Sequence, residues 1–241
     1  MRGAQTFILF VFTGDKIPLK PRLLFLTVLL YCARKYNFKY MGTLPHQERS
    51  LVILKPDTVQ RSLVGELIKR FEQTGLKIVA MKMIVPTEEQ LLTHYNKDDA
   101  WYERKGKGVA EELASQGKVV DREPMEYGKD IIRTIVRYMT AAPVVAMILE
   151  GNKAVSVVTK IVGSTEPSTS DVGTIRGDYT LDSYSHATFE NRAVRNLVHQ
   201  SESPEEAERE IVIWFKENEM MQYTTAQERI LYDINFDGKN E

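Results

Sequence analysis

Two short apolar runs most constrain what this chain can fold into. Residues 51–54 (LVIL) and 143–149 (PVVAMIL) each have the length of a strand, and neither alternates with polar residues. An unbroken run of this length is typical of a strand that is covered on both faces. The chain must therefore also supply enough helix to cover a sheet, and the segments between and after these runs must contain it.

Helical spacing is found where that cover is needed. Val64, Leu67, Ile68 and Phe71 recur on one helical face, and Gly75 tolerates the left-handed backbone of a helix end. This spacing predicts a helix over about 63–74. Further helices are predicted after the capping sequence TEEQ to about residue 96, over 131–139 and 152–161, and after the sequence SPEE near the C-terminus.

The order of these elements predicts the fold class. Residues 76–85 alternate as a strand does, and a short strand is expected before the last helix. An α/β (α+β) sandwich, with helices packed on one mainly antiparallel sheet, satisfies this order. Two stretches, about 97–128 and 179–194, lack periodicity. We expect them to be irregular insertions outside the core, the first with at most a short helix.

The first forty residues lack this alternation of strand and helix signals. We expect residues 1–44 to be an appendage, or an over-long start, and residues 45–241 to form the domain. Residues 23–33 (LLFLTVLLYCA) are apolar, but a membrane-spanning helix needs roughly 20 residues. A signal peptide and a membrane-surface contact both stay open for this run. The single cysteine, Cys32, excludes an intramolecular disulfide and favours a cytoplasmic location.

The charge balance argues against a global attraction to nucleic acid. The chain has 32 Lys and Arg against 33 Asp and Glu, a formal net charge of -1. We therefore expect no sequence-specific nucleic-acid partner, and any anion must be bound by a local cluster. The sequence contains neither a GxGxxG nor a GxxxxGK(S/T) phosphate loop. Phosphate chemistry must therefore use other residues.

One histidine stands in a setting that suits phosphoryl transfer. His199 lies in RNLVHQSESPEEAEREI, just before the last predicted helix, and Glu210 lies within that helix. An imidazole can attack phosphorus if one nitrogen is free and an acceptor holds the other. Glu210, or Ser201 bridging to it, can be that acceptor. A histidine near a helix start is more often structural, so this pattern alone leaves both interpretations open.

The whole pattern from about residue 48 to 223 resembles the nucleoside diphosphate kinase family. The matching segments, in the family's order, are ERSLVILKPD, LVGELIKRFEQTG, HY, RYM before PVVAMILEG, GTIRGD, and RNxxHxSxS followed by AxxEI. The resemblance implies a ferredoxin-like sandwich and an enzyme that transfers the γ-phosphoryl group of ATP to nucleoside diphosphates. It implies a ping-pong mechanism through a phosphohistidine.

The resemblance also implies partners and cofactors. These are a homo-oligomer, either hexamer or tetramer, and Mg²⁺ held mainly by the nucleotide phosphates rather than by protein ligands. The alternative is a non-catalytic nucleotide-binding or assembly module of the same fold.

Single residues take roles from the same resemblance. His199 is similar to the phosphorylated nucleophile, Glu210 to the carboxylate that orients it, and Ser201 to the support of that carboxylate. Tyr95 is expected beside the histidine. The nucleotide contacts match Lys55 for the transferring phosphate and a sugar hydroxyl, Arg176 and Thr165 for phosphate, Asn196 for ribose, and Ile131 for the base. Lysine and arginine suit this reaction because charge develops on the equatorial oxygens.

Three positions depart from the family pattern. Thr159, with Lys160 beside it, stands where a second phosphate-binding arginine is usual, so we expect a weaker clamp on phosphate. Ile131 stands at the position of a base-stacking phenylalanine, so that contact must be aliphatic or come from Tyr127 in the first insertion. Gln200 stands where a glycine usually follows the histidine.

Overall fold

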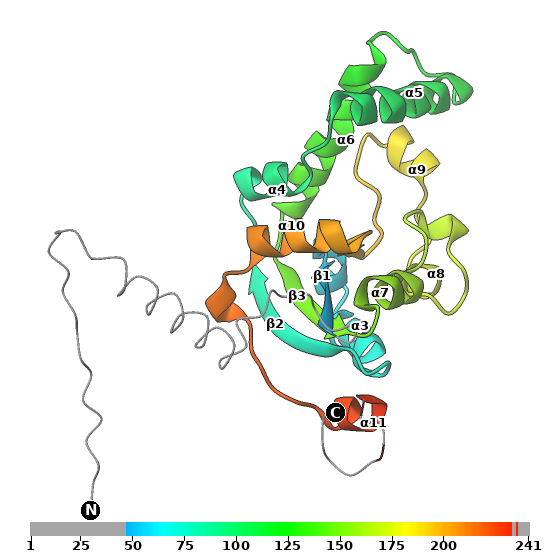
Figure 1. Ribbon diagram of the computed structural model, residues 1–241. Helices are drawn as coiled ribbons and strands as arrows, with labels where there is room; N and C mark the ends of the chain where they lie inside the picture. The colour runs from blue at the N-terminus through cyan, green and yellow to red at the C-terminus, as the bar shows by residue number, and fades with distance from the viewer. Residues whose placement is uncertain (1–46, 233–234, 236–241) are drawn as a thin grey trace, which may run out of the picture. The chain divides into compact units, whose positions relative to one another are not determined.

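The computed structural model describes residues 47–232 and residue 235, and within them the chain forms a four-stranded antiparallel sheet (Figure 1). Strands β1 (Glu48–Leu54), β2 (Lys77–Ile84), β3 (Val144–Gly151) and β4 (Val198–Gln200) lie in the order β2-β3-β1-β4. Each neighbouring pair is antiparallel. The expected appendage 1–44, with its apolar run 23–33, lies outside the described residues.

Short and medium helices connect and cover the strands. They are α2 (Pro56–Gln60), α3 (Val64–Glu72), α4 (Glu88–His94), α5 (Asp99–Ser115), α6 (Pro124–Met139), α7 (Ala154–Val162), α8 (Ile175–Tyr179), α9 (Tyr184–Phe189), α10 (Pro204–Trp214) and α11 (Ala226–Tyr232), with 3-10 turns η2 (Pro167–Thr169) and η3 (Glu217–Glu219). Among the described residues, no helix is both long enough and apolar enough to cross a membrane.

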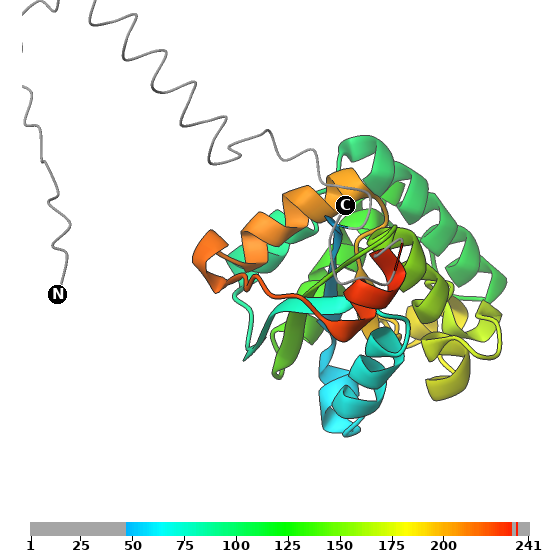
Figure 2. The ribbon, with the colours of Figure 1, turned by 60° about the horizontal axis from the view of Figure 1, so that its bottom comes forward.

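The sheet is covered on both faces, as the apolar runs predict. Leu51 and Ile53 point to one face and pack with side chains from α4, α6 and α10. Val52 and Leu54 point to the other face and pack with side chains from α3, α7 and α8. Figure 2 shows α10 (orange) and α3 (cyan) on opposite sides of the sheet. The prediction of an α+β sandwich on an antiparallel sheet is confirmed.

The prediction that residues 97–128 are irregular is wrong. The stretch holds the 17-residue helix α5 and the start of α6, and these two helices pack against each other. Asp98 caps α5 by accepting from the Trp101 amide at 2.8 Å. The helices approach closely at two glycines: a Cβ on Gly106 would lie 1.6 Å from a carbonyl oxygen of α6, and one on Gly128 would lie 2.1 Å from one of α5. Helix α5 lies away from the sheet (Figure 1), but Trp101 and Tyr102 pack against the core cluster.

The other predicted helices and strands are present, but some of their ends are shifted. Residues 179–194 are mostly irregular, but they contain the short helix α9, which is capped by Ser183. Thr87 caps α4 and Ser203 caps α10, as the sequence predicts. The helices α2, α8 and α11 were not expected, because each has only five to seven residues and too few turns to show a periodic face.

Candidate active site

A tight turn leads into His199 on the edge strand β4. Leu197 has a φ of 68°, a left-handed value that is unfavourable for its side chain. Across it, the amide of the following residue donates to the carbonyl of the preceding one at 2.7 Å, as in a γ-turn. Asp57 Oδ2 accepts from the Leu197 amide (3.2 Å), and Thr58 Oγ1 donates to the Leu197 carbonyl (2.7 Å). The segment after β1 therefore fixes the backbone that carries the histidine.

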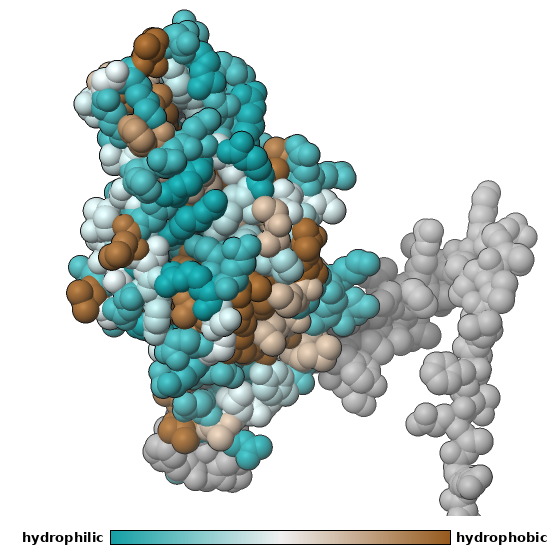
Figure 3. Space-filling view, turned by 180° about the vertical axis from the view of Figure 1, so that it is seen from behind, coloured by the Kyte–Doolittle hydropathy of each residue, from teal (hydrophilic) through white to brown (hydrophobic). Residues whose placement is uncertain are grey.

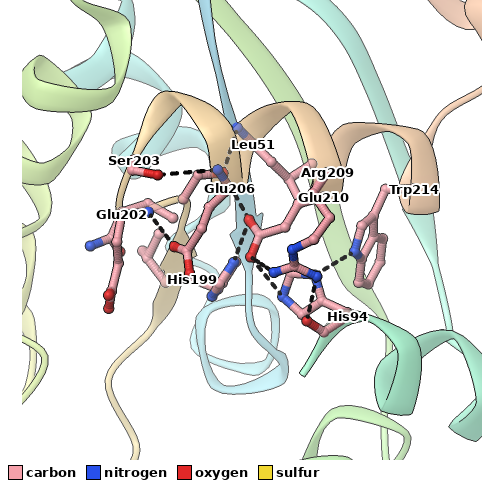
Figure 4. Close-up of polar contacts among 12 residues, drawn as sticks. Leu51, His94, His199, Glu202, Ser203, Glu206, Arg209, Glu210 and Trp214 are labelled. Atoms are coloured by element: carbon pink, nitrogen blue, oxygen red, sulfur yellow. Dashed lines mark hydrogen bonds and ion pairs between the residues drawn. The ribbon is translucent and has the colours of Figure 1, made fainter. Parts of the chain in front are cut away.

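His199, Ser201 and Glu210 come together as the sequence predicts. His199 Nε2 lies 3.1 Å from Glu210 Oε2, and Ser201 Oγ donates to the same oxygen at 2.8 Å. The side chain of Glu210 points from α10 toward β4 (Figure 4). Ser201 Oγ also accepts from the Leu51 amide at 3.3 Å, which ties this group to the central strand β1.

The charge of Glu210 decides which nitrogen of His199 is free. Burial raises the pKa of Glu210, but the hydrogen bond and charge of His199, with help from Ser201, outweigh burial and hold that pKa at about 2. An ionised carboxylate only accepts hydrogen bonds. His199 must therefore carry its proton on Nε2, which leaves a lone pair on Nδ1. The side chain of His199 is 17% exposed, so the ring is not sealed in the core.

Lys55, Asn196 and Thr165 form a second connected group. Lys55 Nζ donates to Asn196 Oδ1 at 2.6 Å, and Asn196 Nδ2 donates to the Thr165 carbonyl at 2.8 Å. Burial, followed by the charge of Arg176, lowers the pKa of Lys55 to about 7. Asn196 thus sets the position of the lysine amine, and that amine is close to losing its charge when no anion is bound.

Arg176 is buried and already makes several hydrogen bonds. Nε donates to the Asn196 carbonyl (3.1 Å), Nη1 to the Gly163 carbonyl (2.9 Å), and Nη2 to the Val198 carbonyl (2.7 Å) and Gln200 Oε1 (3.3 Å). A guanidinium has five N–H donors, so one donor on Nη1 is left without a partner among the described residues. Burial lowers the pKa of Arg176 to about 10.

Aromatic rings surround His199. The ring centroid of Tyr95 lies 5.8 Å and that of His94 lies 4.4 Å from that of His199, both edge to face. Burial, followed by the charge of Glu210, raises the pKa of Tyr95 above its ordinary range, so its hydroxyl keeps the proton. His94 is buried, and its Nδ1 lies 3.2 Å from Trp214 Nε1. Tyr95 therefore stands beside the histidine, as expected.

The remaining predicted positions lie less close to this group. Thr159 and Lys160 are exposed on α7, and the side chain of Thr165 is exposed, so only its carbonyl takes part. Ile131 is half-buried on α6, and none of the hydrogen bonds and ring contacts of the described residues connects it to His199. Tyr127 is 4% exposed and Arg122 lies over its ring, so it offers no open face for a base.

Sequence reasoning missed three residues of the site. Asp57 lies within the matched KPD segment, and His94 lies within the matched HY segment, so both were in view but without a role. Trp214 lies in the helix predicted after SPEE. Its partner His94 lies 120 residues away in the sequence, and no local pattern connects the two.

The side chains here do not form a magnesium site. Among the described residues, His94, His199 and Glu210 could hold a metal ion, with ligand atoms within 4.8 Å of one another. Two imidazole nitrogens and one carboxylate suit zinc-like ions, whereas Mg²⁺ prefers an octahedron of oxygen ligands. Any Mg²⁺ needs oxygen ligands from another source.

Fold and site together define an α+β sandwich enzyme with a carboxylate-held histidine and two buried cations. The nucleoside diphosphate kinase family profile matches residues 48–113 and 124–220. Nucleoside diphosphate kinases of Pyrobaculum aerophilum and Thermococcus kodakarensis are 47% and 42% identical, over 73% and 74% of this chain and 98% and 83% of theirs. The chain therefore belongs to the nucleoside diphosphate kinase family.

Solved structures agree. The NDP kinase of P. aerophilum superposes with a TM-score of 0.69 and 45% identity, covering 73% of this chain and 100% of that one. The structure of the Borrelia burgdorferi nucleoside-diphosphate kinase, a transition state mimic with bound vanadate and ADP, superposes with a TM-score of 0.62 and 32% identity. It covers 75% of this chain and 94% of that one. The chain therefore has the fold and the enzyme class of a nucleoside diphosphate kinase, a phosphotransferase. The comparisons give no support to the non-catalytic alternative.

Proposed function

We propose that His199 Nδ1 carries the phosphoryl group. The observation that supports this is the contact between His199 Nε2 and Glu210 Oε2, because it leaves Nδ1 as the nucleophilic nitrogen. The Nδ1 lone pair attacks the γ-phosphorus of ATP, and the bond to the β-γ bridging oxygen breaks, so its electron pair leaves with ADP. A terminal oxygen of a second nucleoside diphosphate then attacks the same phosphorus and releases the ring.

The surrounding residues bind and orient the nucleotide in this proposal. Lys55 and Arg176 supply positive charge to the transferring phosphate, and an anion near Lys55 restores its full protonation. Thr165 adds a phosphate contact. Asn196 binds ribose, and Tyr95 lies beside the reacting ring. Ile131 supplies an aliphatic contact to the base.

Magnesium enters with the nucleotide. Its oxygen ligands come mainly from the phosphates of ATP, which the donor set of His94, His199 and Glu210 does not replace. When bound, the ion neutralises phosphate charge. The donor is ATP, and the acceptors are nucleoside diphosphates without selection by base edges, since the polar groups of the site meet phosphate and ribose.

Self-association and location are part of the same proposal. Met81 and Met83 point to one side of the edge strand β2 and are 53% and 58% exposed, and Val85, directly after the strand, is 56% exposed. Figure 3 shows an area of hydrophobic surface on the face seen there. An edge strand with such a face supports assembly into a hexamer or tetramer. We place the enzyme in the cytoplasm.

Residues 1–44 are an appendage in this proposal, and residues 45–241 are the kinase domain. The appendage supplies none of the residues named above. A chain that begins at Met41 should therefore keep its solubility and its exchange rate. Insolubility or inactivity of the shortened chain, beside an active full chain, would contradict this division.

The proposed function is tested by labelling the full chain with γ-labelled ATP and chasing with an unlabelled diphosphate. We expect an acid-labile, base-stable label that discharges to any common nucleoside diphosphate. His199→Ala should abolish labelling and exchange, whereas Glu210→Ala should slow them less, because Nδ1 persists and only orientation and charge support are lost. Acid-stable label, or label on Ser201, would overturn the mechanism.

A further inference from the structure

A second histidine lies directly beside the proposed nucleophile. His94 ends α4, its side chain is fully buried, and its ring meets the ring of His199 at 77° with centroids 4.4 Å apart. Among the described residues, no hydrogen bond connects His94 to Nδ1 of His199. A buried imidazole carries two nitrogens that need partners, so its position is costly unless both are placed with care.

Trp214 fixes the tautomer of His94. The indole Nε1 can only donate a hydrogen bond, and it lies 3.2 Å from His94 Nδ1 in a buried contact. His94 Nδ1 must therefore be the acceptor, with a lone pair and no proton. In a neutral imidazole the proton then resides on Nε2.

The protonated Nε2 faces the carboxylate of Glu210. His94 Nε2 lies 3.8 Å from Glu210 Oε1, and it is a buried nitrogen with no hydrogen-bond partner among the described residues. Figure 4 shows His94 between Trp214 and Glu210. Glu210 Oε2 accepts from His199 and Ser201, so His94 is directed toward Oε1, which accepts from Arg209 Nη2 at 3.5 Å.

The same tautomer argues against a metal at this place. A metal bound to His94 Nε2 would need that nitrogen deprotonated, and Nδ1 would then have to carry the proton. A proton on Nδ1 would meet the N–H of Trp214 at 3.2 Å, donor against donor. The group formed by His94, His199 and Glu210 is therefore better described as a hydrogen-bonding group than as a metal site.

His94 is also neutral. Burial, followed by the neighbouring His199 ring, lowers the pKa of His94 to about 2. The other charged groups that face it are Glu210 and Arg209 on α10 and Lys97 beyond its own helix. A neutral donor can support the carboxylate without adding a positive charge next to the His199 ring, which gains positive charge when its Nδ1 is phosphorylated.

We propose that His94 is a positioning residue, locked by Trp214 as the Nε2-protonated neutral tautomer, that holds Glu210 and through it the ring of His199. This inference rests on the proposed role of His199 as nucleophile. It assigns a sequence of contacts from Trp214 through His94 and Glu210 to His199, in which the first and last are hydrogen bonds and the middle one is an electrostatic contact at 3.8 Å. Loss of the Nε2–H removes this support, so that Glu210 holds the ring of His199 less firmly in its orientation.

The tautomer is tested directly in the unliganded full chain, without reference to activity. Nitrogen-proton correlation spectra of the ¹⁵N-histidine-labelled protein distinguish a protonated from an unprotonated ring nitrogen, and His94→Gln identifies the signals. We expect His94 to show protonated Nε2 and unprotonated Nδ1 from pH 5 to 8, without titrating. A protonated Nδ1, titration in this range, or a shift of Nε2 to a metal-bound position when Zn²⁺ alone is added would each overturn the proposal.

The positioning role is tested by a pair of variants in the labelling assay. His94→Phe keeps the aromatic volume but loses the hydrogen bond from Trp214 and the 3.8 Å electrostatic contact with Glu210, and we expect labelling to slow about tenfold. KM for ATP should change little. His94→Gln restores both contacts, since its amide can accept from Trp214 and donate to Glu210, and should come within about threefold of wild type.

A matched control separates positioning from stability. Val136→Ala removes apolar volume from α6, in the core cluster that also contains Trp214. Val136→Ala should leave labelling within about twofold, whereas folded His94→Phe should slow it with KM for ATP unchanged. Unslowed labelling in folded His94→Phe, slowing of the same size by Val136→Ala, or equal slowing by His94→Gln would each overturn the role of His94. Loss of labelling in wild type would instead contradict the proposed function.

Discussion

Removing the hydroxyl of Ser201 should weaken both the fold and the nucleophile. Ser201→Ala deletes a 2.8 Å donor to Glu210 and a 3.3 Å acceptor for the Leu51 amide, and both contacts are buried. A hydrogen bond to a charged group contributes about 1.5–3 kcal/mol, and an orphaned buried amide costs about 1–3 kcal/mol. Because the surrounding structure can partly relax after the hydroxyl is removed, we expect the free energy of unfolding to fall by about 2–4 kcal/mol. We also expect labelling of His199 to slow about tenfold.

The pH dependence of that loss gives a sharper test. The pKa of Glu210 is depressed in the folded state, so its contribution is present above its ordinary value near 4.5 and is lost as pH falls toward about 2. Ser201→Ala raises this pKa, so the difference between variant and wild type should shrink as pH is lowered from 7 toward 3. Urea unfolding at one protein concentration measures it, because assembly also stabilises the chain.

Ser203→Ala is the matched control for Ser201→Ala. Ser203 caps α10 by accepting from the Glu206 amide at 3.2 Å, and it does not touch Glu210. It should cost about 1 kcal/mol and leave the labelling rate within about twofold, the change expected from a cap outside the site. If both variants slow labelling equally, or if Ser201→Ala loses no more stability at pH 7 than at pH 3, the reasoning is refuted.

Three further predictions concern the cations. Thr159→Arg should tighten nucleotide binding by about 1.5–3 kcal/mol for each charge-assisted hydrogen bond that it forms. Ser156→Arg, one turn earlier on α7, should leave the affinity unchanged. Calorimetry compares the two variants, and equal affinities would show that the site needs no such arginine. Gln200→Ala should tighten ATP binding a few-fold, because Arg176 Nη2 regains a donor now held at 3.3 Å; weaker binding would mean that Gln200 positions Arg176 instead. Nucleotide binding should be accompanied by proton uptake at pH 8 and not at pH 6, because the pKa of Lys55 is about 7 before binding and rises beside phosphate. Calorimetry in buffers of different ionisation enthalpy measures the number of protons taken up. Lys55→Gln should abolish this uptake.

The parts of the fold that local sequence controls could be predicted. The runs 51–54 and 143–149 form central strands because an apolar segment between two helical layers has no other stable place. Thr87 and Ser203 cap helices because a cap depends only on residues within one turn. The trio His199, Ser201 and Glu210 is likewise local, with at most eleven positions between the partners of a contact.

What could not be predicted depends on contacts between distant segments. Helix α5 has a weak apolar face and two interior glycines, which disfavour helix in isolation. It is stable because Gly106 lets α6 approach within backbone distance. The left-handed Leu197 is also invisible in the sequence, since leucine disfavours that conformation, and Asp57 holds it from 140 positions away.

The two buried cations explain why this site can bind phosphate and why it contributes little to stability. Lys55 Nζ donates to the neutral amide of Asn196, and Arg176 donates to carbonyls and to the amide of Gln200, so neither forms an ion pair with a carboxylate of residues 47–232. Asp57, the acidic group near Lys55, is turned to the amide of Leu197. The charge of both cations is therefore disfavoured in the unliganded protein, as their lowered pKa values indicate. A carboxylate partner would stabilise the charged form of each cation in the unliganded protein, but it would also compete with phosphate. Because the described site lacks such a partner, the two cations gain a compensating anion only when the nucleotide binds.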